Sequence, residues 1–172
     1  QNGKYQTEDE ISNHQKALRM VLNLLTDAHW GVLRDLKEID GVGHRVLHGG
    51  EYFKESVRVT PEDIVKMEEL VELGPLHMPA NIMGIKACAE LMPGVPQVAV
   101  FDTAFHQTVP KEAHIYGVPY EYYEKYAVRR YGFHGTSHKY VARRCARLMD
   151  RPLEELKIVT CHLGNGCSLT AV

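Results

Sequence analysis

The sequence predicts an α/β protein, because short apolar runs rich in β-branched residues alternate along the chain with stretches of helical periodicity. The clearest strand is 97–101, which follows Pro96 and ends at a single acid, Asp102. The clearest helix begins at Thr60, an N-cap residue that a proline follows. The composition, 44% hydrophobic and 24% charged, is ordinary for globular domains and sufficient for a core.

Composition and charge also exclude several functions. A net charge of −2 argues against partners such as nucleic acid or an anionic membrane. No apolar run approaches the roughly 20 residues of a membrane helix, and no signal peptide is recognisable, so we expect a cytoplasmic protein. The four cysteines form no CxxC pair and are expected to be reduced, buried thiols: Cys88, Cys145, Cys161 and Cys167.

The first predicted helix covers 7–25, where Thr7 and Glu10 form a capping box. Its apolar stripe consists of Ile11, Leu18, Val21, Leu22 and Leu25.

A strand is then predicted within 39–50, a segment that carries polar side chains. Alternation places Arg45 and Leu47 on the face opposite His44 and His48. Because a buried arginine is costly without an anion, two interpretations stay open. Arg45 is either a surface residue of an edge strand or a group that binds a carboxylate or phosphate.

Two helices, 60–71 and 81–91, precede the strand that ends at Asp102. The loop between them carries His77, and loop histidines are usually solvated. Asp102 either caps the following turn or contacts a ligand, because α/β folds place ligand-binding groups at the carboxyl ends of strands.

The segment 109–126 contains five tyrosines, which are Tyr116, Tyr120, Tyr122, Tyr123 and Tyr126. Acids lie among them, so packing or a protein interface is favoured over stacking on nucleic acid.

Two glycine-rich stretches end the chain. In the first, glycines flank Phe133 and His134, and Thr136 or Ser137 is expected to cap the helix that follows. A glycine-rich loop before a helix can bind an anion, but an ordinary capped turn has the same pattern. The second, 158–172, reads as a hairpin whose tip could cradle a phosphate.

Five motifs together resemble the acetate kinase family in order and spacing: GHRVLHGG at 43–50, PLHMP at 75–79, VFDTAFHQT at 100–108, YGFHGTSH at 131–138 and CHLGNG at 161–166. The resemblance covers 39–172, and the preceding helix resembles the family only loosely. It implies part of the ribonuclease H-like, duplicated fold of actin and sugar kinases, incomplete in this chain. An acyl-substrate domain is expected over 1–103 and the start of a nucleotide-side domain over 104–172.

The resemblance implies a reversible, in-line phosphoryl transfer from ATP to acetate that gives acetyl phosphate and ADP. Mg²⁺ or Mn²⁺ and a homodimer are expected with it. A propionate or butyrate kinase shares these motifs, and a catalytically inactive fragment that only folds or dimerises is the alternative from another class. A metal hydrolase built from the ten histidines is the weakest idea, since no HExxH spacing occurs.

The resemblance also assigns roles to residues of this chain. Arg45 would bind the substrate carboxylate and the transferring phosphoryl group, His134 would donate to that group, and Asp102 would lie near the metal. The remaining matches are His77 and His162 as supporting histidines; His162, Gly164, Asn165 and Gly166 at the ATP phosphates; and Leu47, Leu76 and Phe133 around the acetate methyl. Acetate is ionised at neutral pH, with a pKa of about 4, so Asp102 is expected to act electrostatically rather than as a base.

The sequence departs from the family pattern in several features. It lacks the family's first strand with its phosphate loop, its later adenosine-binding glycines, a second catalytic arginine and a metal-linked glutamate. It starts without methionine and stops within a predicted strand, so we expect an internal fragment that does not turn over alone. Leu47 replaces a valine found in many members, which weakly favours acetate over propionate.

Overall fold

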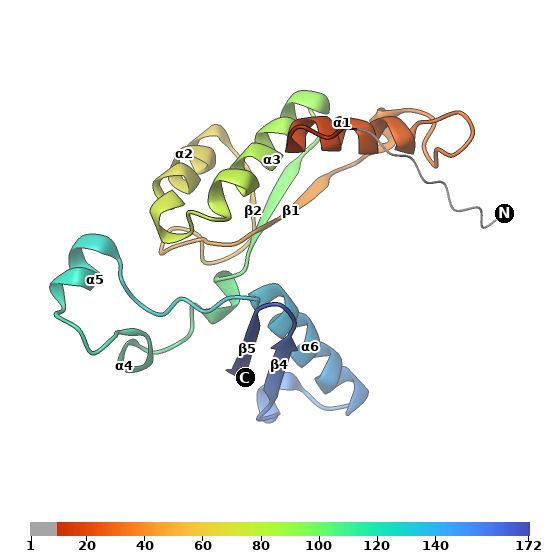
Figure 1. Cartoon of the computed structure of the whole chain (residues 1–172). Helices are drawn as coiled ribbons and strands as arrows, with labels where there is room; N and C mark the ends of the chain where they lie inside the picture. Colours follow the sequence, from red (N-terminus) through yellow and green to blue (C-terminus); the bar gives the residue numbers. More distant parts are fainter. Residues whose placement is uncertain (1–9) are drawn as a thin grey trace.

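The computed structural model describes residues 10–172, which form two sheets and the helices around them (Figure 1). The mixture of strands and helices agrees with the predicted α/β class. The elements in chain order are α1 (His14–Leu25), β1 (Val42–Val46), β2 (Val57–Arg58), α2 (Pro61–Glu69), α3 (Met78–Leu91), β3 (Gln97–Phe101), α4 (Lys111–His114), α5 (Glu121–Tyr126), α6 (Gly135–Leu148), β4 (Val159–Leu163) and β5 (Cys167–Ala171).

The first sheet has the order β1-β3-β2, so the strand predicted at 97–101 lies at its centre. β3 runs parallel to β1 and antiparallel to β2. The register pairs Arg45 with Val100 and Val46 with Phe101, so Arg45 approaches the carboxyl end of β3. Among the described strands, β1 lies at an edge of this sheet.

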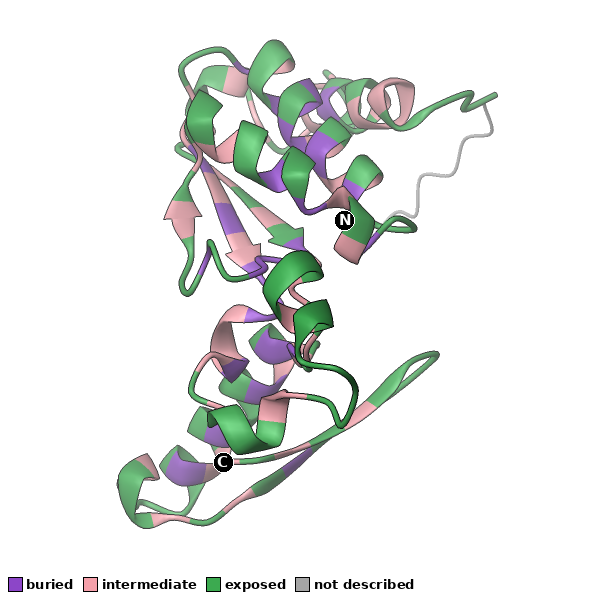
Figure 2. Ribbon diagram, turned by 90° about the vertical axis from the view of Figure 1, so that its left-hand side faces the viewer, coloured by how far each residue is buried: buried purple, intermediate pink, exposed green. Residues whose placement is uncertain are grey.

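Helices α1, α2 and α3 cover this sheet, and α3 contacts β1 and β3 (Figure 1). The buried residues concentrate between the helices and the sheet (Figure 2). Phe53 and Phe101 stack there with ring centroids 4.4 Å apart. The main core consists of Val46, Phe53, Met67, Leu70, Met78, Ile82, Ile85, Ala99 and Phe101.

The first helix begins later than the sequence predicts. Thr7, the predicted cap, lies outside the described residues. The structure places the N-cap at Asn13, whose side chain accepts a hydrogen bond from the Lys16 amide, so the predicted helix is wrong over 10–13. The stripe that packs on α3 contains Leu18, Leu22 and Leu25, whereas Ile11 and Val21 are exposed.

The predicted capping of α2 is confirmed, since Thr60 and Asp63 cap each other reciprocally. The next helix, α3, begins at Met78 instead of the predicted Asn81. Pro79 is accommodated in its first turn, where a missing N–H leaves no helical hydrogen bond unmade.

The second half contains α6 and the antiparallel pair β4 and β5, which forms the predicted hairpin. The prediction of a cap at Thr136 or Ser137 is wrong. His134 occupies the N-cap position with a positive φ of 55°, and both hydroxyl residues lie within the first helical turn.

The remaining features concern the surface. The tyrosines of α5 and its approaches are largely exposed. All four cysteines are free thiols, but Cys161 and Cys167 are exposed, so their predicted burial is wrong. Within 10–172, no helix has the length and apolar character needed to cross a membrane.

Candidate active site

Asp102 is the fully buried centre of the candidate site. Its oxygens accept hydrogen bonds from Arg45, over 3.1 Å from Nε to Oδ1 and 2.7 Å from Nη2 to Oδ2. The His134 amide donates to Oδ2 over 3.2 Å. The peptide of Asp102 also joins the two halves of the chain, because its N–H donates to Val46 and its carbonyl oxygen accepts from the Gly135 amide.

Arg45 reaches Asp102 because β1 and β3 run in parallel and in register. Both interpretations of Arg45 keep some support: among the described strands β1 is an edge strand, and Arg45 meets a carboxylate that the protein itself supplies, so binding of an external anion stays a prediction. The hydrogen bond to Asp102 raises the pKa of Arg45, against an opposing effect of burial. Its side chain is 64% exposed, so the guanidinium remains accessible to a ligand.

His134 stands beside this pair at the start of α6. A Cβ on Gly135 would collide with the carbonyl oxygen of Asp102, which explains why glycine follows His134. The rings of His134 and His162 stack with centroids 3.9 Å apart and an interplanar angle of 18°. Burial, followed by the charge of His162, lowers the pKa of His134. Nδ1 of His162 is hydrogen-bonded to Ser137 Oγ over 3.0 Å.

Most predicted site residues line one cleft of about 590 Å³. Asp102 lies behind Arg45 instead of at the cleft wall, Leu76 is 89% exposed in its loop, and Gly164 is not a lining residue. The lining residues are Arg45, Leu47, His77, Asn81, Phe133, His134, His162, Asn165 and Gly166.

Asn81 is a lining residue that the sequence argument did not assign to the site. Its side-chain oxygen accepts a hydrogen bond from the Leu47 amide over 3.0 Å, which anchors the end of β1 to α3. An asparagine near a predicted helix start is ordinarily a cap, so its pattern carries no signal of this contact. Two other unassigned polar residues, His138 and Ser168, lie directly behind His134.

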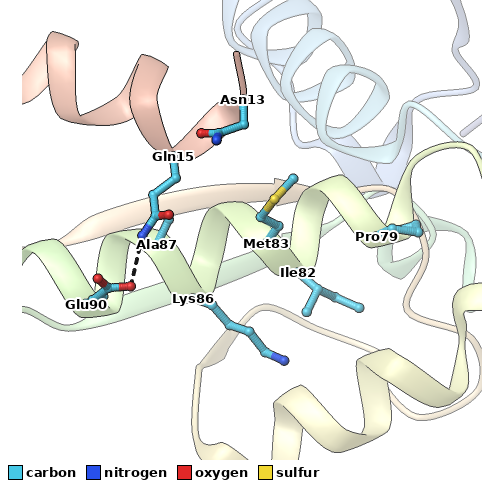
Figure 3. Close-up of a pocket in the computed structure, with 8 residues that line it drawn as sticks. All are labelled: Asn13, Gln15, Pro79, Ile82, Met83, Lys86, Ala87 and Glu90. Atoms are coloured by element: carbon cyan, nitrogen blue, oxygen red, sulfur yellow. Dashed lines mark hydrogen bonds between the residues drawn. The ribbon is translucent and has the colours of Figure 1, made fainter. Parts of the chain in front are cut away.

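A second hollow, of about 440 Å³, lies between α1 and α3 (Figure 3). Gln15 and Glu90 are hydrogen-bonded across it over 3.0 Å. It contains no histidine, and none of its lining residues belongs to the Arg45 cleft. The Arg45 cleft therefore remains the candidate active site.

The described residues do not form a metal site by themselves. From residue 10 to residue 172, no group of three or more His, Cys, Asp or Glu side chains could hold an ion. Both oxygens of Asp102 already accept hydrogen bonds, and the carboxylate is fully buried. Asp102 in this arrangement does not fit the role of a direct metal ligand.

The cleft combines three chemical capacities. The planar guanidinium of Arg45 suits a carboxylate or a phosphoryl group. Leu47 and Phe133 supply apolar surface beside it, and His134 and His162 supply ring nitrogens. The backbone near Gly166 is open to close approach by a phosphate. A small anion with a short apolar part and a phosphorylated partner would satisfy all three.

The chain is similar to known proteins of one family. The sequence profile of the Acetokinase family matches residues 1–172, so the likeness extends through the first helix as well. An acetate kinase of Caldanaerobacter subterraneus is 63% identical over 169 residues, which cover 98% of this chain and 42% of that protein. An acetate kinase of Halothermothrix orenii is 62% identical over 165 residues, which cover 96% of this chain and 42% of that protein.

Solved structures show the same fold. The acetate kinase of Porphyromonas gingivalis superposes with a TM-score of 0.90 at 46% identity, over 95% of this chain and 41% of that one. A propionate kinase of Francisella tularensis gives 0.84 at 43% identity, over 92% and 40%. The chain spans about 42% of the length of the curated relatives it matches. Motifs, profile and fold agree, and the chain belongs to the acetokinase family.

Proposed function

We propose that this chain carries the acyl-substrate side of an acetate kinase, which transfers a phosphoryl group from ATP to acetate and forms acetyl phosphate and ADP. The observation that carries the proposal is the cleft in which an oriented guanidinium, two stacked histidines and two apolar side chains converge. Family membership supplies the reaction class.

Arg45 is the principal binding group in this proposal. Asp102 holds one edge of its guanidinium, and the exposed remainder binds the acetate carboxylate and then the equatorial oxygens of the transferring phosphoryl group. Acetate is already ionised at neutral pH, so no general base is needed. Asp102 is buried behind Arg45 and therefore acts by orienting it, not by touching acetate.

The histidines and the hairpin turn serve the phosphate side. His134 and His162 hydrogen-bond the transferring group, and His77, which lines the same cleft, supports them. The backbone of the Gly164–Gly166 turn, with Asn165, approaches the ATP phosphates. Mg²⁺ or Mn²⁺ bound to ATP would neutralise phosphate charge, and Asp102, which does not fit the role of a direct ligand, would influence it only indirectly. Leu47 and Phe133 contact the acetate methyl, whereas the exposed Leu76 contributes only if its loop folds inward.

We further propose a division into an acyl-substrate domain at 1–103 and a nucleotide-side domain that begins at 104–172. A cytoplasmic homodimer, with the exposed tyrosines near α5 in its interface, completes the proposal. Because the chain spans about 42% of the length of its relatives, the 172 residues alone are expected to be inactive.

Propionate kinase is the second candidate, favoured by the likeness to the Francisella tularensis enzyme. Both substrates would place an alkyl group against Leu47, and one methylene is worth about 1–3 kcal/mol in a fitted pocket. Turnover on acetate and propionate, compared at equal concentration in the same preparation, separates the two functions.

The proposal is tested by trapping acetyl phosphate as a hydroxamate in the protein that contains this chain. Arg45→Lys keeps the charge but removes the planar fork, so KM for acetate is expected to rise about tenfold, equivalent to about 1.4 kcal/mol. Arg58→Lys, on β2 and exposed, is the matched control and should change nothing. Formation of no acetyl phosphate, or equal KM values for Arg45→Lys and the unaltered protein, would contradict the assignment.

A further inference from the structure

A buried histidine lies behind the candidate catalytic histidine and is hydrogen-bonded to two hydroxyl groups. His138 is 1% exposed. Its Nδ1 lies 2.7 Å from Thr160 Oγ1, and its Nε2 lies 2.8 Å from Ser168 Oγ. The same Ser168 oxygen lies 2.8 Å from Nδ1 of His134. A continuous chain of hydrogen bonds therefore leads from Thr160 on β4 to the ring of His134, which lines the cleft.

The hydrogen bond made by the Thr160 hydroxyl determines which group donates in each of the other hydrogen bonds. A hydroxyl group has one proton to donate, and a carbonyl oxygen can only accept. The Thr160 hydroxyl contacts the carbonyl oxygen of Thr170 over 3.4 Å, and its own burial keeps water away. With that proton directed to Thr170, Thr160 Oγ1 accepts from His138, and the proton of His138 is on Nδ1.

The remaining links follow from the neutral state of His138. Its burial lowers its pKa, and the charges of His106, His134 and His162 lower the pKa further. A neutral ring protonated at Nδ1 has a lone pair at Nε2, so Ser168 must donate there. The single proton of Ser168 is then used, and its oxygen can only accept from Nδ1 of His134.

We propose that Ser168 is a positioning residue, which, together with His138 and Thr160, fixes neutral His134 with its proton on Nδ1. The lone pair at Nε2 is then left for the cleft, where a Cβ on Gly166 would lie 3.7 Å from this nitrogen. The catalytic meaning rests on the proposed function, whereas the position of the proton does not.

The consequence concerns how His134 meets a phosphoryl group. In the neutral ring Nε2 accepts hydrogen bonds, because the one ring proton is bound at Nδ1 and directed to Ser168. His134 therefore donates to a phosphoryl oxygen from Nε2 only after that nitrogen has gained a proton. Ser168 continues to accept from Nδ1 in both states, so the ring does not have to turn when Nε2 is protonated.

The test is nitrogen-15 NMR of the protein labelled at histidine, recorded at about pH 8 so that ordinary histidines, with a pKa near 6.5, are neutral. Long-range couplings from the ring carbons' protons distinguish protonated from bare ring nitrogens. The unaltered protein should show His134 protonated at Nδ1. Neutral His134 protonated at Nε2 would overturn the proposal without any variant.

Thr160→Val tests the relay at its far end, two side chains away from His134. Without the Thr160 oxygen, a proton on His138 Nδ1 would be a buried, unpaired N–H, which is tolerated less well than an unpaired lone pair. The proton of His138 is then expected at Nε2, Ser168 donates to His134, and the major form of His134 changes to the one protonated at Nε2.

Ser137→Ala is the matched control, because it removes a hydroxyl group that contacts His162 and not His134. The form of His134 should stay unchanged in this variant. An unchanged His134 in Thr160→Val, or an equal change in both variants, would refute the relay. Acetyl phosphate formation is measured separately, so an inactive protein with the expected Nδ1 proton would count against the proposed function alone.

Discussion

Replacement of Arg45 by alanine should destabilise the protein mainly because it leaves the buried carboxylate of Asp102 without its charged partner. Asp102 has no exposed surface, and its two oxygens accept from Arg45 and the His134 amide. Without the guanidinium, one backbone N–H remains as the partner of a buried carboxylate. Breaking a buried ion pair from one side costs about 3–5 kcal/mol.

The expected cost is at the low end of that range, about 3 kcal/mol, because the Arg45 side chain is 64% exposed and water can reach the vacated position. Asp102→Asn should cost about 2 kcal/mol, since charge-assisted hydrogen bonds are lost while Arg45 stays hydrated. The double variant, Arg45→Ala with Asp102→Asn, should cost about 2–3 kcal/mol instead of the sum of about 5. In this variant, removal of Arg45 leaves a neutral asparagine behind and no buried charge.

Urea unfolding followed by circular dichroism measures these free energies. With a slope of about 2 kcal/mol per molar, Arg45→Ala should lower the midpoint by about 1.5 M. Arg58→Ala, at an exposed site on β2, controls for the loss of an arginine and should shift the midpoint little. If the two single costs add to the double within about 0.5 kcal/mol, the two side chains are not coupled and the reasoning fails.

Two further predictions follow from packing and burial. Gly135→Ala should lower stability and abolish activity, because its Cβ meets the Asp102 carbonyl oxygen. Gly84→Ala, with open space around it inside α3, should instead stabilise the protein by up to about 1 kcal/mol. Thermal unfolding measures both changes in stability, and equal effects would contradict the packing argument. Burial lowers the pKa of His48 to about 4, below the 6.5 of an unfolded chain. The unfolded state therefore binds the proton first, and the unfolding free energy should fall as pH drops from about 6.5 towards 4, by at most about 1.4 kcal/mol per pH unit. His48→Asn, whose side-chain oxygen can still accept from the Gly50 amide, should flatten that slope in urea titrations, and an unchanged slope would assign it to other groups.

Local sequence patterns correctly predicted the helices and strands whose capping residues and apolar spacing agree with how they pack in the structure. The strand at 97–101, the capped start of α2 and the hairpin formed by β4 and β5 all appear where their residues indicate. The first helix shows the limit of such patterns. The helix was predicted from residue 7, but residues 10–13 are not helical, and α1 begins at His14 with Asn13 as its N-cap, near the point where its apolar side chains start to pack on α3.

The candidate site was predicted as a set of residues but not as an arrangement. Arg45 and Asp102 were each singled out, yet their pairing depends on the parallel alignment of β1 and β3, which neither segment encodes alone. The predicted cap of α6 at Thr136 or Ser137 was wrong because Gly135 approaches Asp102 closely. This approach makes His134, in a left-handed conformation, the N-cap residue. The contact between His138 and Ser168 joins residues 30 apart, and no spacing rule reveals it.

The parallel pairing of β1 and β3 also determines when during folding the site can exist. Arg45 and Asp102 are 57 residues apart, and His134 joins them from 32 residues further along. Contacts across such separations form only after the intervening chain has closed, so they carry a loop-closure entropy that local helices do not. Partly folded chains would thus contain α2 and α3 but no anion-binding cleft, and an anion that bridges Arg45 and His134 would select the completed fold and hold its two halves together.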